Sequence, residues 1–288
     1  MDPTRQTSFF GPIPSRDEAM TAYLSFLGER NGCDRPQARF APREQWLAGA
    51  DAAAVRWSGH ADQRTFESGW ASFRTAGIRE PALCALLAFA KINAGEAYGV
   101  EAVGRARHQQ PATDEPLSRV ERMLLKEEEY HTRILLGAAH QFGLTPPQAA
   151  YRPPVSVKVL IGTLVHAPSS FFHPVLLAAE VGGLFLFNWL LGRVNEIYAS
   201  EPQLRDSLEA RLIEIIIDEI GHVAFNRVAV GPLGLRVGRT LAPEVAHATA
   251  GALPELAALG WTRATLEGFE HFTLESLPEV ARRRAFFA

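Results

Sequence analysis

Apolar residues recur at helical spacing in four long stretches of the chain, and proline or glycine marks their ends. The stretches cover about residues 81–108, 117–142, 174–200 and 201–231. Stretches of this length with a period between three and four residues predict long helices. The sequence therefore predicts an all-α fold whose centre is made by these four helices.

The flanking segments show weaker helical patterns. Residues 1–80 contain a helix start at Ser15, and we expect this segment to form an N-terminal helical cover. Residues 231–288 predict a C-terminal cap with helices at about 243–259 and 265–284. Because both segments are expected to pack on the four-helix region 81–230, we predict one domain spanning residues 1–288. A long connection at 146–173 is expected to hold a short helix at 155–165.

The pattern Glu-x-x-His occurs twice within the predicted helices, as Glu128 with His131 and as Glu219 with His222. Residues three positions apart lie on one face of a helix, so each pair directs a carboxylate and an imidazole the same way. An unpaired carboxylate in an apolar interior is costly, and a metal ion removes that cost. One copy alone would suit a polar patch near a helix end; two copies favour a metal site.

One further glutamate precedes each pair in an apolar helix. Glu96 and Glu180 both stand in the pattern small-small-Glu-x-x-Gly. Glu101 is the competing candidate in the first helix, but it lies about 140° around the helix from Glu96 and is expected to face solvent. Four carboxylates and two imidazoles are the ligand set of a two-metal site in a four-helix bundle. The predicted ligands are Glu96, Glu128, His131, Glu180, Glu219 and His222.

This pattern resembles the ferritin-like, non-heme diiron-carboxylate superfamily, and within it the oxygen-activating oxygenases and oxidases. The resemblance covers about residues 81–230. It implies a ferritin-like four-helix bundle with a long crossover between helices 2 and 3. It also implies two iron ions, with manganese or a mixed manganese–iron pair as alternatives. By resemblance, Glu128 and Glu219 bridge the ions, Glu96 and Glu180 are terminal ligands, and each histidine binds one ion.

The resemblance also implies an activity. We expect a dioxygen-activating enzyme that hydroxylates, N-oxygenates or desaturates a small organic substrate with electrons from a reductase or ferredoxin. The alternatives are peroxide disproportionation at a dimanganese site, as in manganese catalases, and iron binding or oxidation without an organic substrate. The full set of four glutamates favours iron, and the 80 residues before and 58 after the four-helix region favour a cover over a substrate.

Residues next to the predicted ligands have expected roles as well. Asp218 is predicted to pair with His131, and Glu127 with His222, because a metal-bound histidine usually donates its other N–H to a carboxylate. A solvated surface charge is the alternative for Glu127. Expected contributors to a substrate or dioxygen pocket are Gly99, Gly183, Phe187 and Asn226. Close helix packing is the alternative for the glycines, and an ordinary buried amide is the alternative for Asn226.

Composition limits the expected location and partners. The net charge of −3 provides no general attraction to nucleic acid or to anionic lipid, and gives no support to a tRNA-modifying enzyme. Glu180 interrupts the most apolar run, 175–191, so no membrane span is expected. Two cysteines without metal-type spacing and the lack of a signal-peptide pattern favour the cytoplasm. A homodimer is compatible with this picture.

Overall fold

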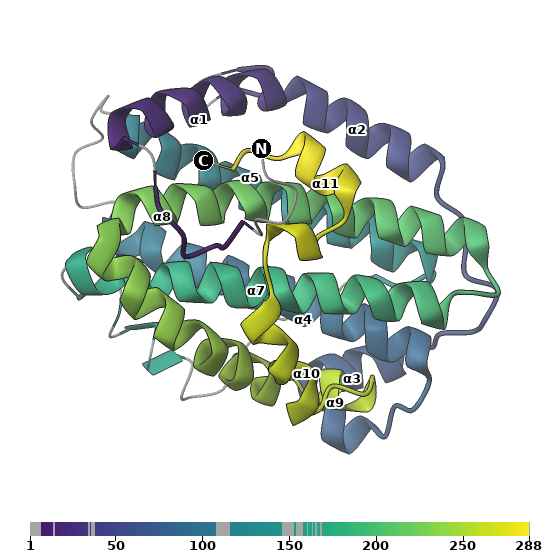
Figure 1. The fold of residues 1–288 in the computed structure, drawn as a ribbon. Coiled ribbons are helices and arrows are strands. Elements are labelled where there is room, and N and C mark those ends of the chain that lie inside the picture. Colours follow the sequence, from purple (N-terminus) through teal and green to yellow (C-terminus); the bar gives the residue numbers. More distant parts are fainter. Residues whose placement is uncertain are drawn as a thin grey trace.

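The computed structural model describes most of the chain. It covers residues 7–107, 116–145 and 169–287 except Pro14, Asp34, Pro36 and Gln37, together with single positions between 153 and 167. All regular elements in these ranges are helices, as Figure 1 shows. The all-α class predicted from the sequence is confirmed for the described residues.

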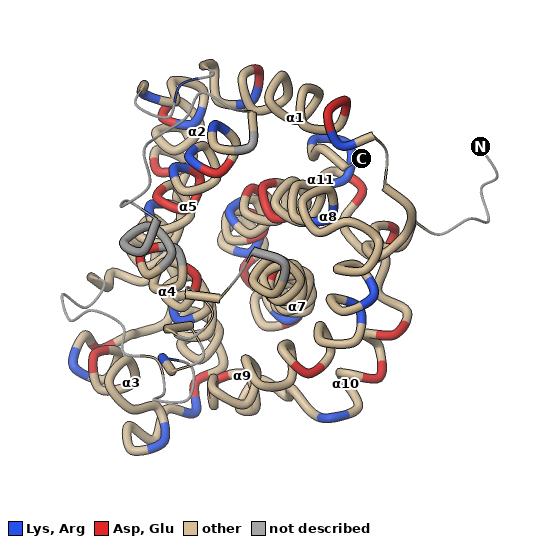
Figure 2. The backbone as a smooth tube through the Cα atoms, turned by 90° about the vertical axis from the view of Figure 1, so that its left-hand side faces the viewer, with Lys and Arg blue, Asp and Glu red and all other residues tan. Residues whose placement is uncertain are grey.

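Four long helices lie side by side around a common interior. They are α4 (Pro81–Arg107), α5 (Pro116–Gln141), α7 (Ser169–Ile197) and α8 (Pro202–Ala252). Helix α4 packs against α5 and α7, and α8 packs against the same two helices. Seen along the helices, these four elements surround one interior, and the shorter elements lie outside them (Figure 2). The buried side chains of this interior are mostly apolar, and most of the buried charged groups gather in one cluster described below.

Contacts at one end of the molecule fix the directions of these helices. The Tyr198 hydroxyl, just after α7, donates to the carbonyl of Ala82 at the start of α4, at 2.9 Å. The ring of Phe142, just after α5, lies 6.1 Å from the ring of Tyr198. Helices α5 and α7 therefore end at the same end of the molecule and run in the same direction. Most of residues 146–168, with the helix expected at 155–165, lies outside the described residues.

Helix α8 is sharply bent at Gly231. The backbone there has φ 66° and ψ −179°, a conformation that glycine reaches without steric strain. Pro232 follows directly and suits the first turn of the next helical segment. The fourth predicted helix therefore ends where the sequence indicated. The predicted helix start at Pro243 is wrong, because Pro243 lies inside a helical segment that already begins after the bend.

The segment after the bend turns back along α7. A Cβ atom built on Gly182 would lie 3.4–3.5 Å from backbone and side-chain atoms of Ala246, and one on Gly238 would lie 3.3 Å from the carbonyl of Pro174. Residue numbers rise in the same direction along both helices, from Pro174 beside Gly238 to Gly182 beside Ala246, so this segment runs parallel to α7. Helix α7 therefore packs against the first half of α8 on one side and against the second half on another. Helix α7 also begins at Ser169, five residues before the start predicted at Pro174.

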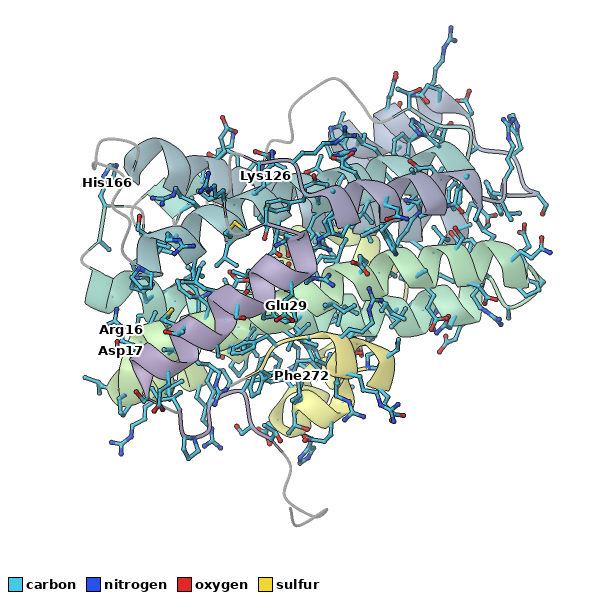
Figure 3. The ribbon with its side chains drawn as sticks, turned by 90° about the horizontal axis from the view of Figure 1, so that it is seen from above. Arg16, Asp17, Glu29, Lys126, His166 and Phe272 are labelled. Carbon is cyan, nitrogen blue, oxygen red and sulfur yellow. The ribbon has the colours of Figure 1, made fainter. Side chains whose placement is uncertain are left out.

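Three helices precede the four long ones: α1 (Arg16–Asn31), α2 (Ala41–Ala52) and α3 (Gln63–Ala76). Helix α1 begins directly after Ser15, as predicted, and ends at Gly32, where φ is 72°. Helix α1 packs against α5 and α8, α2 packs against α5, and α3 packs against α4. From above, α1 and α2 lie across the long helices, with Arg16 and Asp17 in the first turn of α1 (Figure 3).

The C-terminal segment consists of short elements. They are α9 (Pro254–Ala258), α10 (Arg263–Glu267), the 3-10 turns η1 (Gly268–His271) and η2 (Leu274–Ser276), and α11 (Glu279–Arg284). The single helix predicted over 265–284 is therefore wrong. Thr262 and Thr273 begin new elements with capping boxes, and Pro278 directly precedes the last helix, so the chain restarts three times within this stretch.

Helix α7 is the most apolar of the long helices. Within the described residues, only its segment Phe171–Ile197 is long and apolar enough to cross a membrane by length and composition, with a mean hydropathy of 1.7. Of its most apolar window, 56% is buried inside the protein. Helices at the centre of a protein core pass the same test, so this feature is weak evidence for a span.

Candidate metal centre

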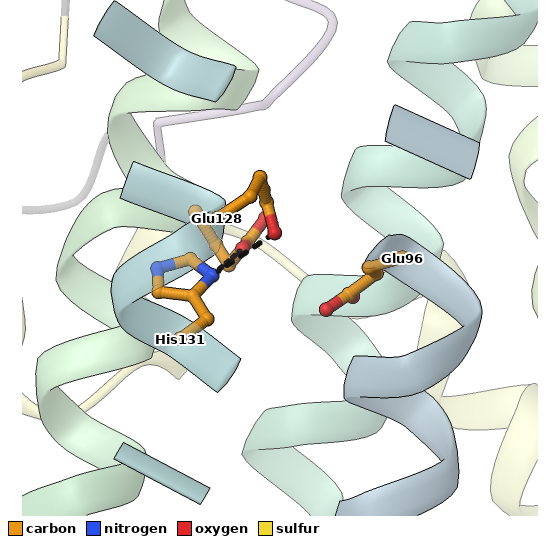
Figure 4. Close-up of side chains that lie close together, drawn as sticks. Glu96, Glu128 and His131 are labelled. Carbon is orange, nitrogen blue, oxygen red and sulfur yellow. Dashed lines mark ion pairs between the residues drawn. The ribbon is translucent and has the colours of Figure 1, made fainter. Parts of the chain in front are cut away.

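The six side chains predicted to be ligands lie together in the interior between α4, α5, α7 and α8. They form two groups, Glu96, Glu128, His131 and Glu219 in one and Glu180, Glu219 and His222 in the other. In each group, one potential ligand atom per residue lies within 4.8 Å of the others. Both groups contain Glu219. In Figure 4, Glu96 points from its helix towards Glu128 and His131.

Helix α8 positions the centre of this cluster because its middle is buried on every side. Every residue from Leu212 to Val228 is buried, including Glu219 and His222 at 2% exposure each. Isoleucines fill the faces towards the neighbouring helices, which leaves one face for the polar pair. Glu101, which helical spacing excluded as a ligand, is exposed as expected, and Glu129 beside Glu128 is exposed as well.

Two carboxylates lie between the two imidazoles. Glu128 directs Oε2 to within 3.3 Å of Nδ1 of His131 and Oε1 to within 3.4 Å of Nδ1 of His222. Glu219 directs Oε1 to 3.4 Å from the first of these nitrogens and Oε2 to 3.5 Å from the second. Each carboxylate thus has one oxygen towards each ring. Glu180 approaches one ring only, at 4.0 Å from Nδ1 of His222.

The outer nitrogen of each imidazole faces a carboxylate on the other helix. Nε2 of His131 lies 3.1 Å from Oδ2 of Asp218, and Nε2 of His222 lies 3.3 Å from Oε2 of Glu127. These are the two pairs expected from the sequence. With Nε2 engaged in this way, Nδ1 of each ring faces the cluster and is the nitrogen available to a cation. Glu127 is 1% exposed, so the surface-charge alternative is wrong.

Burial and neighbouring charges shift the pKa values of the carboxylates in and beside the cluster in opposite directions. Desolvation raises the pKa of Glu96 and of Glu180 well above its ordinary value, and the charge of Glu219 raises both further. Burial would also raise the pKa of Asp218, but the positive charges of Arg30 and Arg43 outweigh it and hold that pKa well below its ordinary value. Asp218 is therefore kept anionic, while Glu96 and Glu180 are held towards their protonated forms because several acids share one interior.

The neighbouring carboxylates raise the pKa values of both imidazoles. Burial alone would lower the pKa of His131, but the charge of Glu128 and the hydrogen bond to Asp218 outweigh it and raise that pKa well above its ordinary value. The pKa of His222 is raised in the same way, against the effect of burial, chiefly by Glu219 and Glu127. The cluster thus favours a positive charge at the point where Nδ1 of His131 and Nδ1 of His222 lie close to the carboxylate oxygens.

Several buried atoms at the centre of the cluster form no hydrogen bond within the described part of the chain. They are Oε2 of Glu96, Oε2 of Glu128, Nδ1 of His131 and Oε1 of Glu219. Buried polar atoms in proteins almost always have a partner, so a group of such atoms in one place calls for an explanation. Carboxylate oxygens together with neutral imidazole nitrogens are ligands for divalent transition-metal ions. The donor set therefore fits a metal site.

The charge balance around the cluster indicates how much positive charge it can accept. Among the described residues, seven carboxylates are connected in and around the cluster, namely Glu96, Glu127, Glu128, Glu180, Glu214, Asp218 and Glu219. Glu96 and Glu180 are partly exposed and the other five are buried. The guanidinium groups in contact with them number three, namely Arg30, Arg43 and Arg284. With every carboxylate ionised and both histidines neutral, as binding of a cation requires, four negative charges remain. Two divalent cations would balance them.

Several residues of this network were missed by the sequence analysis. Arg30 and Asn31 at the end of α1 and Arg43 in α2 contact Asp218 or Glu127. Glu214 in α8 pairs with the same two arginines. A signal was present, because Glu214 is a third acid beside Asp218 and Glu219 in the isoleucine-rich run. Three acids in one buried run require partners from elsewhere in the chain.

The residues expected to shape a pocket have different surroundings. A Cβ atom on Gly183 would lie 3.2 Å from Oε1 of Glu96, so this glycine makes room for the predicted ligand itself. No described atom lies within 4 Å of a Cβ atom on Gly99. Phe187 is fully buried in the hydrophobic core. Nδ2 of Asn226 donates to the carbonyl of His222 at 3.0 Å, while its Oδ1 is buried without a hydrogen bond.

The structure thus defines an all-helical protein with a buried carboxylate–histidine cluster suited to divalent cations. Comparison of the chain with protein-family models, with curated proteins and with solved structures found no match. The function below is therefore inferred from the cluster and its surroundings.

Proposed function

We propose that this chain is a non-heme diiron enzyme with a ferritin-like four-helix bundle, which activates dioxygen to oxidise a small organic substrate. The observation that carries the proposal is the placement of Glu128 and Glu219, each with one oxygen towards each imidazole. Two carboxylates that each face both imidazoles would suit a pair of ions better than a single ion, because these four residues would offer donors to two positions.

The donor set supports iron as the metal. Hard carboxylate oxygens stabilise the higher oxidation states of iron, and imidazole suits iron in either state. Manganese, or a mixed manganese–iron pair, uses similar ligands, and the elemental analysis described below distinguishes these alternatives from two iron ions. When bound, two iron ions would supply the electrons and the Lewis acidity that dioxygen activation requires.

The protein side chains would hold and shield this pair. Glu128, Glu219, His131 and His222 would be the fixed ligands, since all four are buried and α8, which carries Glu219 and His222, is packed on every side in this region. Asp218 and Glu127 would keep Nδ1 of each imidazole directed inwards through the contacts to Nε2. The surrounding isoleucines would exclude water, which strengthens every electrostatic interaction inside the cluster.

Substrate and dioxygen would approach from the side of the terminal carboxylates. Glu96 and Glu180 are the two partly exposed members of the cluster, and the side chain of Glu180 is 20% exposed against 0% for His131. Gly99 lies one turn after Glu96, with no described atom within 4 Å of where its Cβ would be. The reaction would be hydroxylation, N-oxygenation or desaturation, with electrons from a reductase or ferredoxin.

Elemental analysis tests the proposal directly. Protein purified from cells supplied with iron and manganese should contain close to two iron ions per chain, and the Glu219→Ala variant should lose both. Glu129→Ala is the matched control, because Glu129 lies on α5 beside Glu128 but is exposed and pairs with Lys126. Dioxygen uptake by the reduced protein is the second measurement.

Other outcomes decide against the proposal. Two manganese ions, together with rapid loss of hydrogen peroxide, would assign the site to peroxide disproportionation. Iron oxidation without any consumption of an organic compound would assign it to iron handling. A wild-type protein without metal would show that the cluster has a structural role only.

A further inference from the structure

A buried arginine from outside the four long helices reaches the metal-site carboxylates. Arg43 lies in the first turn of α2 and is 3% exposed, although arginine is almost never fully buried unless it is paired. Its guanidinium group enters the space between α5 and α8, behind the two imidazoles. Helix α2 thus contributes a cation to a part of the molecule where several buried acids lie together.

The guanidinium group of Arg43 has a partner for each of its nitrogens. Nη2 lies 2.5 Å from Oδ2 of Asp218 and 3.3 Å from Oε1 of Glu127. Nη1 donates to Oε1 of Glu214 at 2.9 Å, and Nε donates to Oδ1 of Asn31 at 3.0 Å. A planar group with this many fixed partners has a single orientation, and a lysine ammonium cannot reproduce it.

The contacts of Arg43 connect the two halves of the site. Asp218 is the partner of His131, and Glu127 is the partner of His222. One guanidinium nitrogen therefore lies between the two outer carboxylates and closes a continuous chain of contacts from one imidazole to the other. Asn31 supports the same link, because its Nδ2 donates to Oε1 of Glu127 at 3.0 Å.

We infer that Arg43 is a positioning residue for both metal positions, which fixes Asp218 and Glu127 together and through them the orientation of both imidazoles. This inference rests on the proposed metal site. It goes beyond that proposal, because it assigns a role in the site to a helix that contributes no ligand. It also explains why a charged side chain is buried at the N-terminal end of α2, where positive charge is unfavourable beside the helix dipole.

Arg30 offers a built-in comparison. Its Nε donates to Oδ1 of Asp218 at 2.7 Å and its Nη2 to Oε1 of Glu214 at 3.0 Å. No contact to Glu127 is present among the described interactions of Arg30. Arg30 thus acts on the His131 side only, whereas Arg43 acts on both sides. The two arginines should differ in how many metal positions they affect.

Cobalt(II) titration of the metal-free protein separates these effects. Co(II) alone is the probe, and its visible absorption reports ligand geometry as well as the number of ions bound. The wild-type chain should bind two ions. Arg43→Lys keeps the charge but loses the planar guanidinium group. Both dissociation constants should therefore rise about tenfold, which is the lower end of the effect of changing residues that hydrogen-bond to metal ligands. The absorption bands should shift as well. Arg30→Lys should weaken one binding step.

Arg211→Lys is the matched control. Arg211 is a buried arginine on α8, bonded to Asp51 and to the carbonyl of Ile134, away from the cluster. It should leave both binding steps and the spectrum unchanged. Asn31→Ala is a second, milder variant, because it removes the acceptor of Nε of Arg43 and leaves the guanidinium in place. It should shift the same bands by less.

The outcomes distinguish this inference from the proposed function. A wild-type chain that binds no Co(II) would overturn the metal site itself. Two ions bound with wild-type affinity and spectrum in folded Arg43→Lys and Asn31→Ala would overturn the role of Arg43 alone. An Arg43→Lys variant that weakens only one of the two steps would also overturn it, because the inferred role requires both.

Discussion

Nε2 of His131 on α5 lies 3.1 Å from Oδ2 of Asp218 on α8, directly beside the cluster that both helices build. The mirror contact joins His222 on α8 to Glu127 on α5. In both cases the carboxylate is the residue immediately before a glutamate that faces both imidazoles. Each helix therefore supplies a glutamate to the interior and a carboxylate to the outer nitrogen of the neighbouring helix's histidine.

The first prediction concerns this contact. Asp218→Asn removes the charge that favours an Nε2–H on His131 and should weaken metal binding about 10- to 100-fold, as changes behind a ligating histidine typically do. Competition against a chelator of known affinity measures the effect. The exposed Glu129→Gln serves as the control and should bind metal normally. Equal affinity for Asp218→Asn and the wild type would show that the contact does not orient the ring.

The second prediction concerns Gly221, the residue before His222. A Cβ atom there would lie 2.7 Å from the hydroxyl of Tyr23 on α1, which is too close. Gly221→Ala should therefore destabilise the protein by about 1–3 kcal/mol, because α1 must move or the ring must leave its site. Urea unfolding of the metal-free protein measures this change.

Gly192→Ala is the comparison for that substitution. Gly192 is an exposed glycine of α7 with no described atom within 4 Å of a Cβ position. Alanine there should stabilise the helix by about 0.5–1 kcal/mol. If Gly221→Ala and Gly192→Ala changed the free energy of unfolding in the same direction, the close approach of Tyr23 would not control the effect of Gly221→Ala.

The third prediction concerns a buried ion pair away from the cluster. Nζ of Lys91 on α4 lies 2.5 Å from Oε1 of Glu255 on α9 and donates to the carbonyl of Gly69 at 2.8 Å. Glu255→Ala leaves a buried ammonium without its counter-charge and should cost about 3–5 kcal/mol of unfolding free energy. Chemical denaturation measures the loss. Metal content should stay at the wild-type value, since α9 contacts no cluster residue among the described contacts.

The fourth prediction concerns pH. In the metal-free protein, the pKa values of Glu96, Glu180, His131 and His222 are all raised well above their ordinary values. The folded state then binds more protons than the unfolded state at pH values above each ordinary pKa. Stability should therefore fall as the pH rises through that window, from weakly acidic towards alkaline conditions.

Metal binding should reverse this dependence. The ligands must lose their protons to bind a cation, so affinity rises with pH, and the bound metal stabilises the fold by about 2.7 kcal/mol per site at a hundredfold excess over the dissociation constant. Thermal unfolding with and without chelator across pH 5–9 measures both effects. Metal-free protein that gains stability towards alkaline pH would contradict the assignment of these raised pKa values.

The inner residues of the site were predictable from the sequence because they lie on helices at fixed spacing. Glu128 with His131 and Glu219 with His222 each occupy one face of one helix, so helical period alone brings them together. The pairing of Asp218 with His131 followed from the usual chemistry of ligating histidines. These inferences needed only local geometry and the assumption that the helices share one interior.

The outer residues were not predictable in the same way. Arg43 reaches Asp218 across 175 residues of sequence, and its contact depends on how α2 lies over α5 and α8. Periodicity gives the face of a helix, but it does not give the partner of that face. The same limit explains the wrong start at Pro243: packing of Ala246 against Gly182 on α7 keeps that segment helical, although the proline favours a helix start there.

The position of the two arginines has a consequence for biogenesis. Chains are synthesised from the N-terminus, so Arg30 and Arg43 leave the ribosome long before the acids of α8. When Glu214 and Asp218 emerge, the cations that neutralise them are already part of the nascent chain. The acidic stretch of α8 therefore meets two of its counter-charges on arrival, and Arg284, the third guanidinium group in contact with Glu214, follows near the end of the chain.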